Sequence, residues 1–362
     1  MKAKYIFFVK IVIAMLVIMS VTIYSDDNIL MDNSPNNLNV KDIKIDPHNA
    51  NIIYAVIENR GLYRSVDKGE TWVFCGTGLP DDIKVIAIDP ITKNIYTGTT
   101  TSLYMSYDGN KWIYLAEFNL IYDIFIQPTE PSKKYIYAAE GLYASTDDER
   151  TWKKYSRLPG VYFAPMATDQ SDPSIIYFEK NKPYDVKIFI VNEMGISEAW
   201  NEMGLYKSND HGETLEKISS TPLLTLLISP NNKNLMYGIP DHGITVSKKI
   251  LKSTDGGVSW KEKDISIVES YIEKLVMNPV DDNVLYAATS NYREGIKDFS
   301  VSRIFKSIDG GETWQKISEF PVNRILIDPS NPNILYAGTP QMGIFKSADA
   351  GKSWKAINNG IE

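Results

Sequence analysis

Charged side chains interrupt apolar segments at one recurring position, and they are the first candidates for chemistry in this 362-residue chain. Short apolar runs end in Asp-Pro or a related pair, and the residues four positions before that Asp or its equivalent are Asp42, Val85, Asp123, Pro165, Thr225, Lys274 and Arg324. The flanking positions are almost wholly apolar, so we expect the four charged members to face water inside the fold, where they could hold a small polar ligand. Water alone could also explain polar side chains there, and the sequence leaves both interpretations open.

Asp42 and Asp123 are the carboxylates that could act together on a glycosidic bond. Hydrolysis of such a bond uses one acidic side chain as a proton donor and a second one as a nucleophile or base. No further motif accompanies the two aspartates, which belong to the first and third repeats of the chain. A hydrolase at this site is therefore the alternative prediction and not the main one.

Other catalytic and metal chemistry has little support in the sequence. A site that grips a carboxylate through three arginines is hard to assemble, because only Arg324 among the seven arginines occupies the recurring charged position. His48, His211 and His242 fall in different repeats, and no His-Glu-x-x-His motif or Cys pair occurs. We therefore predict no catalytic residues, no metal and no cofactor.

Two long insertions hold a second set of candidate binding residues. One insertion runs from Glu179 to Met203 and the other from Ser290 to Ser302. Long loops on a rigid scaffold commonly carry binding residues, and aromatic side chains beside charges suit a sugar or a protein. The ligand-binding candidates on the insertions are Trp200, Tyr184, Tyr292 and Arg293. Trp200 could instead pack its own insertion onto the scaffold.

A turn motif recurs seven times and organises the rest of the chain. Its full form reads Ser, any, Asp, any, Gly, any, any, Trp, as from Ser307 to Trp314. The Asp side chain can accept hydrogen bonds from its own turn, and Gly can take a positive φ. Truncation of Trp260 or Trp314 to Ala is expected to cost about 3–5 kcal/mol. The structural turn residues are Ser65, Asp67, Gly69, Trp72, Asp108, Trp112, Asp147, Trp152, Asp210, Gly212, Ser253, Asp255, Gly257, Trp260, Ser307, Asp309, Gly311, Trp314, Ser347, Asp349, Gly351 and Trp354.

The turn motif resembles the BNR or Asp-box repeat, whose pattern is S-x-D-x-G-x-x-W. That family builds β-propellers and includes sialidases, oligoxyloglucan hydrolases, sortilin-type receptors and photosystem-assembly factors. The resemblance covers nearly all of the chain after residue 38. It implies a propeller scaffold in which the turns are structural, and it does not choose between an enzyme and a binding protein.

The repeat spacing predicts an all-β fold, a single seven-bladed β-propeller of four-stranded antiparallel blades. In each repeat the first strand ends at Asp-Pro, the third runs into the turn and the fourth starts at the Trp. The second strand carries a Tyr, at Tyr54, Tyr96, Tyr137, Tyr177, Tyr237, Tyr286 and Tyr336. Four short strands in about forty residues are typical of a propeller blade. The expected blades are 38–80, 81–118, 119–159, 160–221, 222–266, 267–320 and 321–362, with the first strands around a central channel.

The residues before the repeats read as targeting and tether segments. Residues 1–25 resemble a signal peptide or an N-terminal anchor, because lysines precede an uncharged run from Ile11 to Ile23 that is short for a membrane span. Residues 26–37 read as a polar tether. The ring could close by blade packing alone, or residues 29–31 could add an edge to it.

Composition restricts the partners and the compartment. A formal net charge of −7 argues against a nucleic-acid or anionic-lipid surface, and the single Cys75 excludes an internal disulfide. We predict an exported monomer, extracellular, periplasmic or in the cell envelope, that touches a membrane only through an uncleaved N-terminal anchor. We expect a non-catalytic binding or assembly scaffold that presents its loop face, the face with the insertions of blades four and six, to a protein or glycan. A glycoside hydrolase and a structural envelope repeat are the alternatives.

Overall fold

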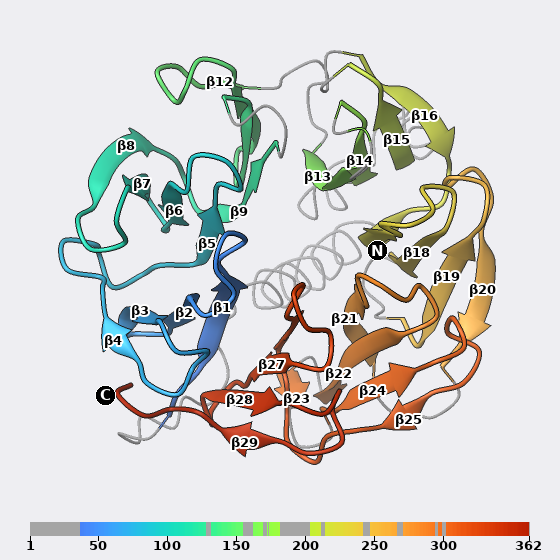
Figure 1. Ribbon diagram of the computed structural model, residues 1–362. Coiled ribbons are helices and arrows are strands. Elements are labelled where there is room, and N and C mark those ends of the chain that lie inside the picture. The colour runs from blue at the N-terminus through green and yellow to red at the C-terminus, as the bar shows by residue number, and fades with distance from the viewer. Residues whose placement is uncertain are drawn as a thin grey trace, which may run out of the picture.

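The protein is a closed ring of seven four-stranded blades, which confirms the predicted fold class (Figure 1). The computed structural model describes residues 37–127, 132–154, 162–168, 172, 174–181, 203–210, 214–241, 247–265, 271–293, 296–298 and 302–361. Every regular element in these residues is a β-strand. None of the described segments is a helix with the length and hydropathy needed to cross a membrane.

The strands of each blade follow one another from the channel to the rim. Blade one comprises β1 (Val40–Ile45), β2 (Ile53–Ile57), β3 (Gly61–Ser65) and β4 (Val73–Phe74). Blades two and three comprise β5 (Val85–Ile88), β6 (Ile95–Gly98), β7 (Ser102–Ser106) and β8 (Ile113–Glu117), then β9 (Ile121–Ile126), β10 (Lys134–Ala138), β11 (Gly141–Ser145) and β12 (Lys153–Lys154). Blades four and five comprise β13 (Tyr162–Thr168), β14 (Ile176–Asn181), β15 (Gly204–Ser208) and β16 (Glu216–Ser219), then β17 (Leu223–Ile228), β18 (Met236–Pro240), β19 (Lys249–Ser253) and β20 (Lys261–Asp264). Blades six and seven comprise β21 (Tyr271–Met277), β22 (Leu285–Arg293), β24 (Ile304–Ser307) and β25 (Gln315–Lys316), with β23 (Ile296–Asp298) beside β22, then β26 (Arg324–Ile327), β27 (Leu335–Gly338), β28 (Ile344–Ser347) and β29 (Lys355–Ala356).

The hydrophobic core lies between the blades. Each pair of neighbouring blades shares one apolar cluster, and between blades five and six Ile239 and Ile250 meet Leu275 and Leu285. The second strands are buried along their whole length in blades one, two, five and seven. They have strands on both edges and blades on both faces, and such positions favour continuous apolar runs. This packing fixes the first strand of every blade at the channel.

The register of blade three corrects one prediction. The sequence pattern selected Tyr137 as the second-strand Tyr, but Lys134 pairs with the turn residue Ser145, as Ile95 pairs with Ser106 in blade two. Tyr135 therefore occupies the position of the second-strand Tyr in the other repeats, and the residue is 2% exposed. The segment contains Tyr at both residues 135 and 137, and a shift of two residues keeps every side chain on the same face of a strand.

The recurring turn is capped by its own side chains. In blade six Ser307 Oγ donates to Asp309 Oδ1 (2.7 Å) and accepts the N–H of Gly311 (2.9 Å). Asp309 also accepts the backbone N–H of Thr313 (2.9 Å) and its hydroxyl (2.5 Å). The Thr313 hydrogen bonds are the main reason that the pKa of Asp309 falls to about 2. Sequence analysis missed this hydroxyl, although Ser or Thr stands at residues 71, 151, 214, 259, 313 and 353.

Each turn also contacts the preceding blade, and we call this set of contacts the blade latch. Three turn tryptophans donate their indole N–H backward, two of them from Trp112 to the Cys75 carbonyl (2.9 Å) and from Trp354 to the Ile317 carbonyl (2.9 Å). A side chain of the preceding blade reaches forward to the turn, as where Lys306 Nζ donates to the Ala350 carbonyl (3.1 Å). The motif therefore joins blades as well as strands, which its pattern alone did not reveal.

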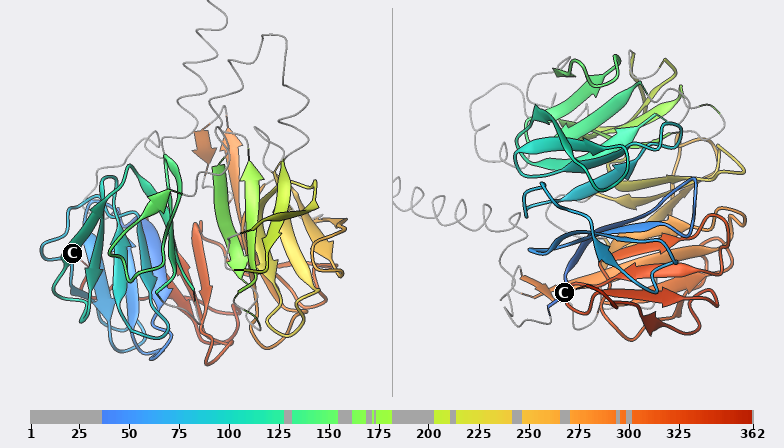
Figure 2. Two further views of the ribbon diagram at one scale, coloured as in Figure 1. Left: turned by 90° about the horizontal axis from the view of Figure 1, so that it is seen from above. Right: turned by 60° about the vertical axis from the view of Figure 1, so that its left-hand side comes forward.

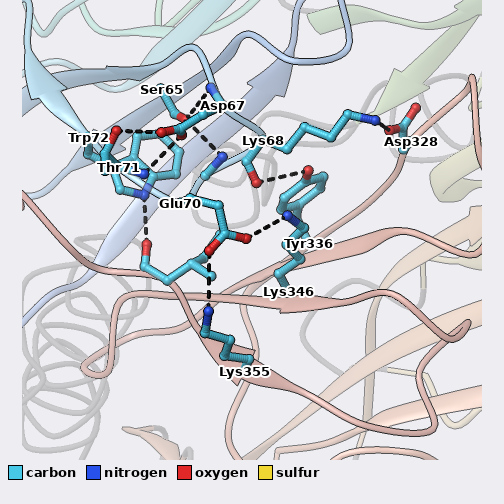
Figure 3. A network of polar contacts seen from close by, with 12 residues as sticks. Ser65, Asp67, Lys68, Glu70, Thr71, Trp72, Asp328, Tyr336, Lys346 and Lys355 are labelled. Atoms are coloured by element: carbon cyan, nitrogen blue, oxygen red, sulfur yellow. Dashed lines mark hydrogen bonds and ion pairs between the residues drawn. The ribbon is translucent and has the colours of Figure 1, made fainter.

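The same latch closes the ring between blades seven and one (Figure 3). Trp72 donates its indole N–H to the Ile357 carbonyl (2.6 Å), and Glu70 forms ion pairs with Lys346 (3.0 Å) and Lys355 (3.2 Å). A short parallel pairing of Leu38 with residue 342 adds a second contact across this junction. These contacts answer the question of closure that the sequence left open. Residues 29–31 lie outside the described residues.

Candidate functional site

The four charged residues of the recurring position lie on innermost strands around the channel (Figure 1). Asp42 is on β1, Asp123 on β9, Lys274 on β21 and Arg324 on β26. The charges of the other three all act on Lys274, so the structure brings the four residues together. Lys44, two residues after Asp42 on the same face of β1, joins them. Sequence analysis missed Lys44 because the other first strands have apolar residues at its position.

A one-residue bulge precedes the charged residue in three of these strands. Strand pairing skips one residue just before Asp42, Asp123 and Lys274. A bulge bends its strand and redirects the side chains that follow it. In these three blades the bulge lies where the start of the first strand pairs with the end of the second strand, beside the loop face. The charged residues therefore line the channel mouth on the loop face.

Asp42 has a structural role at the mouth. The residue is 7% exposed, and its Oδ1 accepts the N–H of Ile43 (2.9 Å). Its Oδ2 accepts the N–H of Ile86 in blade two (3.1 Å) and lies 3.8 Å from Lys44 Nζ. Asp42 is the main reason that the pKa of Lys44 is raised. Both carboxylate oxygens are therefore engaged, and Asp42 and Lys44 largely balance each other.

Asp123 and Lys274 have no ion-pair partner within the described part of the chain. Both residues are exposed positions of innermost strands, and the ring of blades surrounds these strands (Figure 1). The partial loss of bulk water raises the pKa of Asp123, and Lys44 opposes this shift. The same loss of water lowers the pKa of Lys274, and the nearby Arg324 lowers it further. Each side chain is thus shifted toward its neutral form, and a ligand of opposite charge would reverse that shift.

The charges at the mouth are separated by sign. Lys274 and Arg324 belong to neighbouring blades six and seven, whereas Asp123 belongs to blade three. In a seven-membered ring, blade three faces the gap between blades six and seven. With the Asp42–Lys44 pair set aside, the recurring position contributes two cations on one side of the channel and one carboxylate on the other.

An aromatic pair accompanies the carboxylate. Tyr122, the bulge residue before Asp123, is 51% exposed. Its ring centroid lies 5.3 Å from that of Tyr137, with 38° between the ring planes. The alternation of apolar residues did not predict that Tyr122 is exposed, because the bulge that exposes it depends on the pairing of β9 with β10. The mouth therefore offers an aromatic surface beside Asp123.

The candidates on the two insertions are placed only in part. Trp200, Tyr184 and the turn residue Gly212 lie outside the described residues. Tyr292 and Arg293 end β22, opposite Lys297 and Ile296 of β23. Figure 2 shows this hairpin, in orange, extending beyond one face of the ring. The blade-six insertion thus begins as an extension of the second strand.

A second charged cluster is sealed between blades two and three. Lys134 Nζ lies 2.5 Å from Glu149 Oε1 and 3.9 Å from Asp89 Oδ2, and the Tyr96 hydroxyl donates to Glu149 Oε1 (2.7 Å). The exposed fraction of these three charged side chains is 9% or less. This burial makes the cluster part of the blade latch and not a ligand site. In the described residues, no group of three or more His, Cys, Asp or Glu is arranged to hold a metal ion.

The seven-bladed fold is shared with solved proteins of different kinds. A GH74 xyloglucanase from Xanthomonas campestris superposes with a TM-score of 0.67, over 90% of this chain and 55% of the enzyme chain, at 15% identity. YCF48 from Cyanidioschyzon merolae superposes with a TM-score of 0.56, over 86% of this chain and 96% of its own, at 13% identity. Identities this low show a common fold alone.

Sequence comparison gives a narrower match. No protein-family model matches the chain. The VPS10 domain-containing receptor SorCS3 of Mus musculus is 22% identical over 200 residues, which are 53% of this chain and 14% of the receptor. The chain therefore spans a small part of that receptor and about half of the xyloglucanase, and its function has to be argued from its own site.

Proposed function

We propose that this chain is an exported, non-catalytic binding or scaffold propeller that holds a charged part of a protein or glycan at the channel mouth. The observation that carries the proposal is the uncompensated pair of charges, Asp123 and Lys274, on opposite sides of a rigid opening. A ligand with matching charges would stabilise the ionised form of both side chains. YCF48 bound to a D1 peptide has the same fold, with a TM-score of 0.52 at 14% identity, and supports a protein ligand.

The loop face would extend this contact beyond the mouth. The candidates there are Trp200 and Tyr184 of blade four and Tyr292 and Arg293 of blade six, because long insertions on a rigid scaffold commonly carry binding residues. Export is supported by the signal-like residues 1–25. It is also supported by the fold shared with the extracellular domain of a putative one-component system from B. thetaiotaomicron, with a TM-score of 0.58 at 15% identity.

A glycoside hydrolase is the second candidate, and one observation favours it. The raised pKa of Asp123 suits a proton donor, because a general acid must keep its proton near neutral pH. The second carboxylate is the weak part of this mechanism, since both oxygens of Asp42 accept backbone N–H groups. Release of reducing sugar from xyloglucan, abolished by Asp123→Asn, would support the hydrolase against the binding propeller.

Arrays of glycans and of charged peptides test the binding proposal with the full chain. The wild-type protein should be retained on the array, and Lys274→Met and Asp123→Asn should each abolish this retention. Retention of the wild type should weaken as salt is added. Lys249→Met is the matched control, because Lys249 pairs with Glu262 (2.5 Å) on the outer strand of blade five, far from the channel. Retention that is equal in all four proteins would refute a site at the channel mouth.

A further inference from the structure

We infer that the channel mouth recognises a small dipolar ligand that carries both an ammonium and a carboxylate group. The carboxylate would lie between Lys274 and Arg324, and the ammonium would lie against Asp123. This inference rests on the proposed binding function and specifies the chemical class of its ligand. The free ligand would be an amino acid or a similar amino-carboxylate.

The carboxylate end is set by two cations of neighbouring blades, neither of which has an ion-pair partner in the described residues. Lys274 and Arg324 lie on β21 and β26, the innermost strands of neighbouring blades, which contact each other. The charge of Arg324 also contributes to the lowered pKa of Lys274. The Arg324 guanidinium is held in place by a hydrogen bond from Nη1 to the Asn323 carbonyl (2.9 Å). A carboxylate placed here would relieve the repulsion and accept charge-assisted hydrogen bonds from both side chains. A neutral sugar would leave the repulsion in place.

The ammonium end is set by a carboxylate with an unused side. Asp123 Oδ1 accepts the backbone N–H of Ile124 (2.9 Å), and Lys44, the cation that acts most strongly on Asp123, lies 3.8 Å from Asp42 Oδ2. The exposed ring of Tyr122 is next in sequence to Asp123. A cation gains both from a carboxylate and from an adjacent aromatic face. An anionic ligand without an ammonium group would leave this end unpaired.

The rigid ring makes the distance between the two ends a selective feature. Asp123 and the Lys274–Arg324 pair are held on strands of blades three, six and seven, each fixed by packing against its neighbours. A preformed site loses little conformational freedom on binding. We therefore expect one separation of ammonium and carboxylate to bind better than shorter or longer ones.

A series of linear ω-amino acids measures this selectivity by calorimetry with the full chain. The probes are glycine, 4-aminobutyrate, 6-aminohexanoate and 8-aminooctanoate, and hexanoate, hexylamine and glucose are the controls. One length should bind best, and the singly charged probes should bind at least about tenfold more weakly, which is about 1.4 kcal/mol. If the best-binding ω-amino acid binds no more tightly than hexanoate and hexylamine, the dipolar ligand is refuted.

Variants separate this inference from the function on which it rests. Lys274→Met and Asp123→Asn should each remove zwitterion binding, while Lys249→Met should not change it. Affinity should also fall at low pH as Asp123 takes up a proton, and at high pH as Lys274 loses one. If no zwitterion binds but a glycan or peptide still requires Lys274, the dipolar ligand is wrong and the binding propeller stands. If neither kind of ligand depends on Lys274, both are wrong.

Discussion

The interfaces between blades five and six and between blades two and three are latched by different chemistry. In the first, the Tyr237 hydroxyl and Lys252 Nζ both reach the Gly310 carbonyl, at 3.1 and 3.4 Å. In the second, the Tyr96 hydroxyl donates to the side chain of Glu149, which replaces the turn glycine. A lysine nitrogen lies 5.4 Å from the tyrosine ring centroid in both, but between blades two and three it comes from the opposite blade.

The difference shows that two departures from the repeat belong together. Met105 pairs with Tyr96 at the position where Lys252 pairs with Tyr237, so blade two lacks its own lysine. Lys134 supplies that cation from blade three. The equivalent second-strand residues are apolar: Ile53, Ile95, Ile176, Met236, Leu285 and Leu335. The missing turn glycine of blade three is therefore accompanied by a second change in the same blade, and the pair of Lys134 and Glu149 faces Tyr96 of blade two.

The largest expected effect comes from removing one member of this pair. Lys134→Ile leaves the carboxylate of Glu149 buried without its cation, and loss of one partner of a buried ion pair costs about 3–5 kcal/mol. The double variant Lys134→Ile with Glu149→Gly restores the residue types of the other blades. It should lose far less stability than the two single variants together. Urea unfolding measures the cycle, and additive losses would disprove the coupling.

The turn tryptophans sharpen the comparison of the latches. Trp72 is 3% exposed and donates to Ile357 across the ring closure, so Trp72→Ala should cost about 3 kcal/mol or more. Trp260 is half-buried, and its indole nitrogen has no partner in the described residues. Trp260→Ala should therefore cost about 1.5–2 kcal/mol, below the range expected from sequence. Thermal unfolding compares them, and equal losses would contradict a special role at the closure.

Acid stability should depend on the turn hydroxyl. The pKa of Asp309 is about 2 against an ordinary value of 3.8, so its ionised form stabilises the fold above pH 3.8 and this contribution disappears as pH falls toward 2. Asp108 lacks the second hydroxyl donor, because Lys111 stands at the position of Thr313, and its pKa is lowered mainly by the N–H groups of Lys111 and Asn110. Thr313→Val should raise the pKa of Asp309 in an NMR titration. An unchanged pKa would remove the hydroxyl from the explanation.

The smallest effect concerns the fourth turn residue. Ala350 has a positive φ of 58°, where blade six has Gly310 with a φ of 70°. A left-handed backbone costs a residue with a Cβ about 1–2 kcal/mol, partly offset by the entropy that glycine loses on folding. Ala350→Gly should therefore stabilise the protein by up to about 1 kcal/mol. Gly310→Ala should do the reverse, because its Cβ would lie 2.9 Å from Lys252 Nζ. Matched melting curves that rank the two variants otherwise would contradict this.

The sequence predicted what repeats and missed what crosses between repeats. The turn spacing and the alternation of apolar residues are local, so the blades and the channel positions of Asp42, Asp123, Lys274 and Arg324 followed from them. Lys44 was missed because the other six first strands have an apolar residue at the equivalent position. The blade latch and the closure at Trp72 join residues far apart in the chain, and no local pattern records such contacts. The exposure of Tyr122 depends on a bulge that only strand pairing reveals.

NMR titration of the unliganded protein tests the central claim most directly. The claim is that Asp123 and Lys274 are enclosed by the ring and have no ion-pair partner until a ligand binds. The assigned side-chain signals, with Asp123→Asn and Lys274→Met for assignment, give both pKa values. The structure predicts a pKa above 3.8 for Asp123 and below 10.5 for Lys274. Ordinary values for both would mean that the mouth is a simple water-filled opening, and that its charges do not mark a binding site.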